Sequence, residues 1–83
     1  TINDIDFLQE QIEYSELIEG LKENLDNVMI DKYLLKMKSL LKITIENIQM
    51  SLESQNFEDM WQNLSKLRFY IKNINELISM RNK

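Results

Sequence analysis

Phe7–Gly20, FLQEQIEYSELIEG, is the stretch that decides the fold. On a helix with about 100° per residue, its apolar residues and those beside it form two stripes instead of one. The first stripe predicts contact with a hydrophobic core and comprises Phe7, Tyr14, Leu17, Ile18, Leu21 and, further on, Leu25. The second stripe lies roughly opposite and comprises Ile5, Leu8 and Ile12. One stripe is enough to anchor a helix, so the second indicates either a face that docks another protein or a helix that packs obliquely.

The rest of the 83-residue chain continues the helical pattern, with no proline and a single glycine. We predict helices over about 4–24, 28–53 and 57–80. Asn3 or Asp4 can cap the first, and Asn56 with Asp59 three residues later resembles a capping box for the third. Short turns separate these helices. The pattern therefore predicts an all-α fold, an antiparallel three-helix bundle that forms a single domain over 1–83.

The two later helices each have a broad apolar face that predicts its side of the core. In the second helix this face comprises Ile30, Tyr33, Leu34, Met37, Leu40, Leu41, Thr44, Ile45, Ile48 and Leu52, whereas Leu35, Ile43 and Met50 fall off it. In the third helix it comprises Phe57, Met60, Trp61, Leu64, Leu67, Ile71, Ile74 and Ile78. Phe69 lies roughly opposite this last face, so the pattern predicts an aromatic ring on the solvent side of the third helix.

The composition excludes several classes of site. The sequence has no cysteine and no histidine, which removes zinc sites, haem attachment, disulfides and Ser-His or Cys-His catalysis. The net charge is −4 with scattered Lys and Arg residues, so nucleic acid and anionic membrane are unsuitable partners. Arg68 and Arg81 are too few cations for a dicarboxylate site of the chorismate mutase kind. We therefore expect no enzyme, no catalytic residue and no bound metal or cofactor.

The second stripe of the first helix is the main candidate for a binding surface. Leu8 and Ile12 are four residues apart and so are neighbours on a helix. The glutamates that border them are Glu13, Glu16, Glu19 and Glu23. These glutamates form either a solvated face or the acidic rim of a docking patch for a basic partner. Phe69 is either a scattered surface aromatic or the part of the same patch that the third helix contributes.

Two segments give the chain a resemblance to a known family. Asp6–Glu19, DFLQEQIEYSELIE, resembles the start of the C-terminal domain of HscB, the J-type co-chaperone of iron–sulfur cluster assembly, which reads approximately F-L-M-E-Q-L-E-x-R-E-E-L. Lys66–Phe69, KLRF, resembles the family's K-L-R-F in the last helix. The two motifs stand in register within three helices of the right lengths, so the resemblance covers essentially the whole chain.

The resemblance implies a three-helix bundle that binds the iron–sulfur scaffold protein IscU and presents it to the DnaK-type chaperone HscA for cluster transfer. The family's binding face matches Leu8, Gln9, Ile12, Glu13, Glu16 and Phe69 of this sequence. Gln9 stands where the family often has Met, which makes the surface more polar. Gly20 replaces a commonly acidic position, so the resemblance implies no contact there.

The family joins this domain to an N-terminal J domain carrying His-Pro-Asp, which recruits HscA. Because the chain has neither His nor Pro, we expect that module to be absent from it. We expect the protein in the bacterial cytoplasm or the mitochondrial matrix, and as a monomer until the scaffold is added. The alternative function is a helical self-association module whose second stripe is buried in a homodimer.

Overall fold

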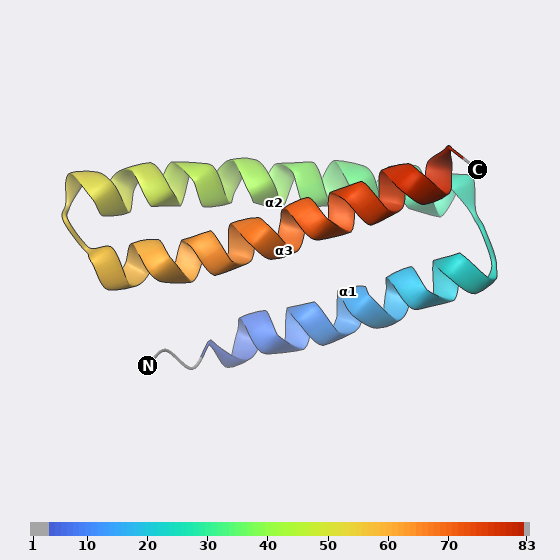
Figure 1. Cartoon of the computed structure of the whole chain (residues 1–83), viewed down its shortest axis with the longest axis horizontal. Coiled ribbons are helices and arrows are strands. Elements are labelled where there is room, and N and C mark those ends of the chain that lie inside the picture. Colours follow the sequence, from blue (N-terminus) through green and yellow to red (C-terminus); the bar gives the residue numbers. More distant parts are fainter. Residues whose placement is uncertain (1–3, 83) are drawn as a thin grey trace.

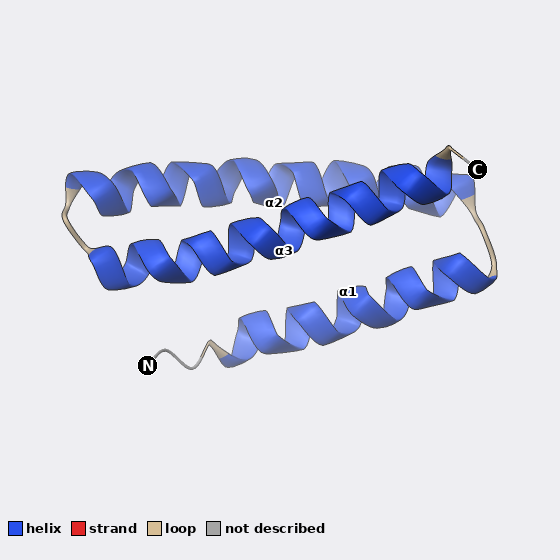
Figure 2. Cartoon of the chain, in the orientation of Figure 1, coloured by secondary structure: helices blue, strands red, loops and turns tan. Residues whose placement is uncertain are grey.

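The computed structural model of the protein describes residues 4–82 and shows three helices joined by short turns (Figure 2). Helix α1 spans Ile5–Glu23, α2 spans Asn27–Glu53 and α3 spans Phe57–Arg81. These bounds confirm the predicted all-α three-helix bundle and differ from the predicted helix ends by at most one residue. No described residue belongs to a strand, and no helix among them is long and apolar enough to cross a membrane.

The three helices differ in how much they contact one another. α2 and α3 run antiparallel and side by side along their whole length, and they share most of the helix–helix contacts (Figure 1). α1 is shorter and lies against α3, beside the end of the hairpin where α2 begins and α3 ends. The opposite, closed end of the α2–α3 hairpin therefore extends beyond α1.

Side-chain caps begin all three helices, and those of α1 and α3 lie where the sequence predicts. The Asp4 carboxylate accepts a hydrogen bond from the Phe7 N–H at 2.9 Å, and Asn56 Oδ1 accepts one from the Asp59 N–H at 3.1 Å. The Asp26 carboxylate accepts from two N–H groups at the start of α2. These bonds satisfy N–H groups that have no partner within their own helix, which fixes where each helix starts.

The hydrophobic core lies mainly between α2 and α3, and one face of α1 completes it. Its buried apolar side chains are Tyr14, Ile18, Leu21, Ile30, Met37, Tyr70, Leu77 and Met80. Phe7 and Leu17 of α1 are partly buried against this cluster, as the first stripe predicts, but Leu25 is half exposed. Gly20 lies inside α1, with no heavy atom within 4 Å of where a Cβ would stand.

The predicted core face of α3 is wrong for part of its length. Phe57, Trp61, Ile71 and Ile78 are exposed, whereas Asn63, Tyr70, Asn73, Leu77 and Met80 are buried. By helical position the buried arc is rotated by roughly 130° from the predicted one. The reason is that α3 contacts both α2 and α1, so its buried side faces the angle between them. In α2, Ile45 and Leu52 of the predicted face are exposed too, and Leu35, Ile43 and Met50 are exposed as predicted.

A polar joint holds the closed end of the hairpin. The buried Ser51 hydroxyl donates to the Asp59 carboxylate, and Asn63 Nδ2 donates to the Asp59 carbonyl oxygen at 2.9 Å. Buried polar groups of this kind are costly unless paired. Of the two bonds only Ser51–Asp59 joins α2 to α3, and a shift of α3 along α2 would break it, so this bond fixes the register of the two helices.

Replacement of Leu77 tests whether the hairpin carries the core. Leu77 has no exposed surface, so Leu77→Ala leaves a cavity and should lower the free energy of unfolding by about 2–5 kcal/mol. Leu35→Ala removes the same atoms from a side chain that is 71% exposed, and it should change the free energy of unfolding by about 0.5 kcal/mol or less. Urea denaturation followed by circular dichroism measures both values. Equal losses in the two variants would contradict this core.

Candidate functional site

The second stripe of α1 forms an apolar ridge on the outside of the bundle. Ile5, Leu8 and Ile12, hereafter the α1 ridge, are 62%, 55% and 56% exposed. The opposite face of α1 contributes Tyr14, Ile18 and Leu21 to the core. This arrangement confirms two distinct stripes and excludes the alternative in which α1 packs obliquely and buries both. Clusters of large, solvent-exposed apolar side chains are a common feature of protein-binding surfaces.

Polar residues of the predicted site flank the α1 ridge on its α2 side. Gln9 and Glu13 line a groove of about 340 Å³ between α1 and α2, and Lys36 and Leu40 form its other wall. Asp6, Glu10 and Tyr14 complete the lining. Glu16 is exposed on the outside of α1. Gln9, Glu13 and Glu16 are therefore accessible, but only Glu16 lies on the same outward side as Leu8 and Ile12 by helical position.

Phe69 is not on the solvent side of α3, where the sequence predicts it. It is partly buried and packs against the core. Its ring meets that of Phe7 edge to face, with centroids 5.7 Å apart and an interplanar angle of 88°, and it also contacts Tyr70. Phe69 thus lies beneath the first turns of α1. It contributes to the candidate site chiefly by supporting the helix that bears the α1 ridge.

Two hydrogen-bonded contacts fix α1 against α3. The buried Tyr70 hydroxyl donates to Glu10 Oε1 at 2.7 Å, and Lys66 Nζ lies 3.1 Å from Asp4 Oδ2 and 5.6 Å from the centroid of the Phe7 ring. Burial, and then the hydrogen bond to Glu10, raise the pKa of the Tyr70 hydroxyl, so it remains a donor. Together with the aromatic contacts, these bonds set the rotation of α1 and hence the direction in which the α1 ridge points.

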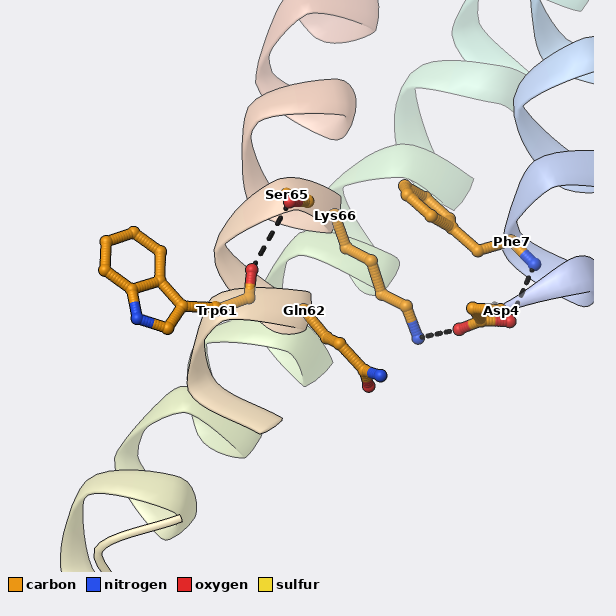
Figure 3. Close-up of a pocket in the computed structure, with 6 residues that line it drawn as sticks. All are labelled: Asp4, Phe7, Trp61, Gln62, Ser65 and Lys66. Atoms are coloured by element: carbon orange, nitrogen blue, oxygen red, sulfur yellow. Dashed lines mark hydrogen bonds and ion pairs between the residues drawn. The ribbon is translucent and has the colours of Figure 1, made fainter. Parts of the chain in front are cut away.

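A second groove, of about 240 Å³, lies between the start of α1 and the first half of α3 (Figure 3). Lys66 extends across it toward Asp4, whereas the Trp61 indole points away from that ion pair. Sequence reasoning assigned Trp61 to the core and gave Lys66 no role. The feature of the sequence that could have identified Lys66 is its place in the KLRF segment, three residues before Phe69.

The electrostatics of α1 are strongly acidic. Its residues Ile5–Glu23 include six carboxylates and one lysine, Lys22, which pairs with Glu19 at 3.2 Å. Lys36 lies across the α1–α2 groove from Tyr14. Interaction with the Tyr14 side chain is the main reason why the pKa of Lys36 is raised, and Lys36 is therefore charged. Within residues 4–82, no three carboxylates converge as a metal site would require. The surface suits recognition of a protein that presents apolar and basic groups.

The two kinds of site residue should differ in their effect on stability. Phe69→Ala removes a partly buried ring and its edge-to-face contact with Phe7, so we expect the free energy of unfolding to fall by about 2 kcal/mol. Leu8→Ala combined with Ile12→Ala removes exposed atoms and should cost about 0.5 kcal/mol or less. Thermal unfolding compares the variants. A double variant as unstable as Phe69→Ala would contradict the exposed α1 ridge.

Asp4 provides a pH-dependent test of the α1 terminus. The hydrogen bond from the Phe7 N–H, and then the Lys66 ammonium, lower the pKa of Asp4 from its ordinary value of 3.8. Because this pKa is depressed on folding, the contribution of Asp4 to stability is present above pH 3.8 and is lost as the pH falls through its lower folded value. An NMR titration of the Phe7 amide should show a midpoint below 3.8. Lys66→Ala should raise the midpoint only partly, because the backbone hydrogen bond remains. A parent midpoint at or above 3.8 would refute the cap.

Comparison with known proteins agrees with the architecture and with the two motifs. The model of the HSCB C-terminal oligomerisation domain family matches residues 3–78, which includes all of α1 and α2 and most of α3. Neither the curated proteins nor the solved structures contain a match to the chain. The family match spans the α1 ridge, the α1–α2 groove and the Lys66–Phe69 segment. The chain therefore belongs to the HSCB C-terminal oligomerisation domain family, which confirms the resemblance to the C-terminal domain of HscB.

Proposed function

We propose that this co-chaperone domain binds an IscU-type iron–sulfur scaffold protein through the outer side of α1. The observation that carries the proposal is the exposure of Leu8 and Ile12 on a helix whose opposite face is firmly buried. Exposing these side chains costs hydrophobic free energy that a partner would recover. Membership of the family supports a partner in iron–sulfur cluster assembly.

Leu8 and Ile12 form the apolar centre of the proposed interface. Energetically important residues of an interface usually lie at such a centre, where the partner excludes water from them. Glu13 and Glu16 flank this centre, and Gln9 offers an amide that can both donate and accept hydrogen bonds. The carboxylates accelerate association with a basic surface and select against acidic ones, more than they add affinity.

Phe69 has a supporting role in this proposal. Its ring and that of Tyr70 lie against Phe7 on α1, one residue before Leu8. A helix held in its binding orientation loses less freedom when it binds, which favours affinity. Replacing Phe69 should therefore weaken binding through the position of α1, in addition to any direct contact of its remaining exposed edge.

Cluster transfer requires a further partner. In the proposed function, the family's J domain recruits the DnaK-type chaperone HscA, while the three-helix domain holds the scaffold. The cluster is cargo of the scaffold, and the present chain contributes no thiolate to it because it contains no cysteine. This function places the protein where the scaffold works, in the bacterial cytoplasm or the mitochondrial matrix.

Titration calorimetry with an IscU-type scaffold tests the proposal. The parent chain should bind with saturation at one scaffold per chain. Leu8→Ala combined with Ile12→Ala should weaken binding by about tenfold to a hundredfold, which corresponds to about 1.4–2.8 kcal/mol. Leu35→Ala combined with Leu52→Ala is the matched control, because it truncates two exposed aliphatic side chains of α2 that lie away from the flank of Tyr33 and Lys36, which faces α1.

Three results would contradict this interface. The first is no heat of binding by a folded parent chain, and the second is equal weakening by the control pair. The third concerns charge: Glu13→Gln combined with Glu16→Gln should lower the association rate and its sensitivity to salt. An association rate that changes neither with these substitutions nor with the salt concentration would contradict a role for Glu13 and Glu16 in binding.

A further inference from the structure

Most of the cations of the chain lie in two segments that contain no carboxylate. Residues 32–45 of α2 contain four lysines, and residues 60–75 of α3 contain Lys66, Arg68 and Lys72. Neither segment contains an Asp or a Glu. Along the sequence these cations are scattered among apolar residues, so only the fold decides which of them share a surface.

The register of the α2–α3 hairpin places these two segments side by side. Ser51 contacts Asp59 at the closed end of the hairpin, and Asp31 pairs with Arg81 at 3.0 Å at the other end. Because α2 and α3 run antiparallel between these two contacts, the middle of α2 lies beside the middle of α3 (Figure 1). The two cationic segments therefore overlap along the length of the hairpin.

One cation of each segment is engaged by α1. Lys36 Nζ of α2 lies 5.9 Å from the centroid of the Tyr14 ring. Lys66 Nζ of α3 lies 3.1 Å from Asp4 Oδ2. These two contacts identify the flank of each hairpin helix that faces α1, and they leave the other side of the hairpin to other cations.

Four exposed cations lie on the side of the hairpin away from α1, and we call them the hairpin basic patch: Lys38, Lys42, Arg68 and Lys72. In α2 they follow Lys36 by two and six residues, and in α3 they follow Lys66 by the same two intervals. At about 100° per residue, these intervals correspond to positions roughly 160° and 120° round the helix from the flank that faces α1. None of the four has an ion-pair partner among residues 4–82.

The hairpin basic patch combines positive charge with exposed apolar surface. Ile45 is three residues after Lys42 and Ile71 is three residues after Arg68, so each isoleucine is a helical neighbour of a patch cation. Both isoleucines are 43% exposed. The nearest carboxylate beyond the two segments is Glu46, which lies at the outer edge of the patch by helical position. The side of the hairpin away from acidic α1 therefore carries a surplus of positive charge.

We infer that the hairpin basic patch binds an acidic segment of a second protein partner, one that is rich in Asp and Glu and carries an apolar side chain for Ile45 and Ile71. The inference goes beyond scaffold binding and does not rest on it. Charge complementarity selects partners, because like charges brought together across an interface are costly. Acidic α1 and the hairpin basic patch therefore select partners of opposite charge, and a partner of one surface does not compete for the other.

The composition of the patch favours an acidic protein over a nucleic acid or an anionic membrane. Firm binding of nucleic acid commonly takes about six to ten phosphate contacts, more than the four cations of the patch supply. The net charge of −4 also opposes approach to any highly anionic polymer or surface. A protein segment can pair with the cations and bury Ile45 and Ile71 at the same time, which recovers hydrophobic free energy.

Fluorescence anisotropy of a labelled peptide titrated with the 83-residue chain tests this inference. The probe is a peptide of about ten residues, long enough to cross both helices when extended, made mostly of glutamate with leucine near its middle. Lys42→Gln combined with Arg68→Gln should weaken binding at least about tenfold. Lys22→Gln combined with Lys32→Gln makes the same change of net charge off the patch and should weaken binding less than about twofold, because screening limits charge effects at a distance. Circular dichroism confirms that each variant is folded.

A second probe, with glutamine in place of every glutamate, isolates the contribution of charge. It should bind the parent at least about tenfold more weakly than the acidic peptide, and binding of the acidic peptide should weaken as the salt concentration rises. Equal binding of the two peptides would overturn the inference. So would equal weakening by the two double variants, or no binding by the folded parent at concentrations up to about 1 mM.

Other occupants of the patch give distinct results, and each would overturn the inference. Tighter binding of a single-stranded oligonucleotide, or of vesicles with equal parts of phosphatidylserine and phosphatidylcholine, would assign the patch to another class of partner. Self-association of the parent that Lys42→Gln/Arg68→Gln abolishes would show that acidic α1 of a second copy occupies it. Scaffold titration keeps this test separate from the proposed function, because the same folded variant should bind an IscU-type scaffold like the parent.

Discussion

The contact of Phe7 with Phe69 and Tyr70 determines how α1 is presented, and the candidate site depends on it. The three rings pair at centroid distances of 5.7–6.3 Å, and the Tyr70 hydroxyl reaches Glu10 one turn further along α1. α1 has few other attachments to the hairpin compared with those that α2 and α3 share. If α1 turned about its axis by one residue position, Leu8 would move toward the bundle and the α1 ridge would be lost.

Much of this structure follows from the sequence, for physical reasons that can be named. The helix ends are set by short-range interactions, namely the caps at Asp4, Asp26 and Asn56, so they can be read locally. The two opposite stripes of α1 were predictable as well, but the sequence left open whether oblique packing would bury both, and the structure shows that Ile5, Leu8 and Ile12 are exposed. The Phe7–Phe69 contact joins residues 62 positions apart, and only the relative rotation of two helices decides it.

The rotation of α3 is the feature that the sequence could not supply. Apolar content favours the arc with Ile71 and Ile78, but the buried arc contains Asn63 and Asn73. Asn63 is satisfied by the Asp59 carbonyl oxygen, while Asn73 Nδ2 has no hydrogen-bond partner within residues 4–82. Burying these amides costs free energy that packing around Tyr70 and Leu77 offsets. A pattern of hydrophobicity contains no information about that balance, which is why Phe69, Trp61, Ile71 and Ile78 were misplaced.

The error in α3 and the anomaly in α1 have the same physical origin. Each helix carries more apolar surface than one core of an 83-residue domain can bury, because a small domain has a large surface for its volume. In α1 the surplus is a short ridge bordered by carboxylates, and in α2 and α3 it consists of exposed side chains that include Leu52, Ile71 and Ile78.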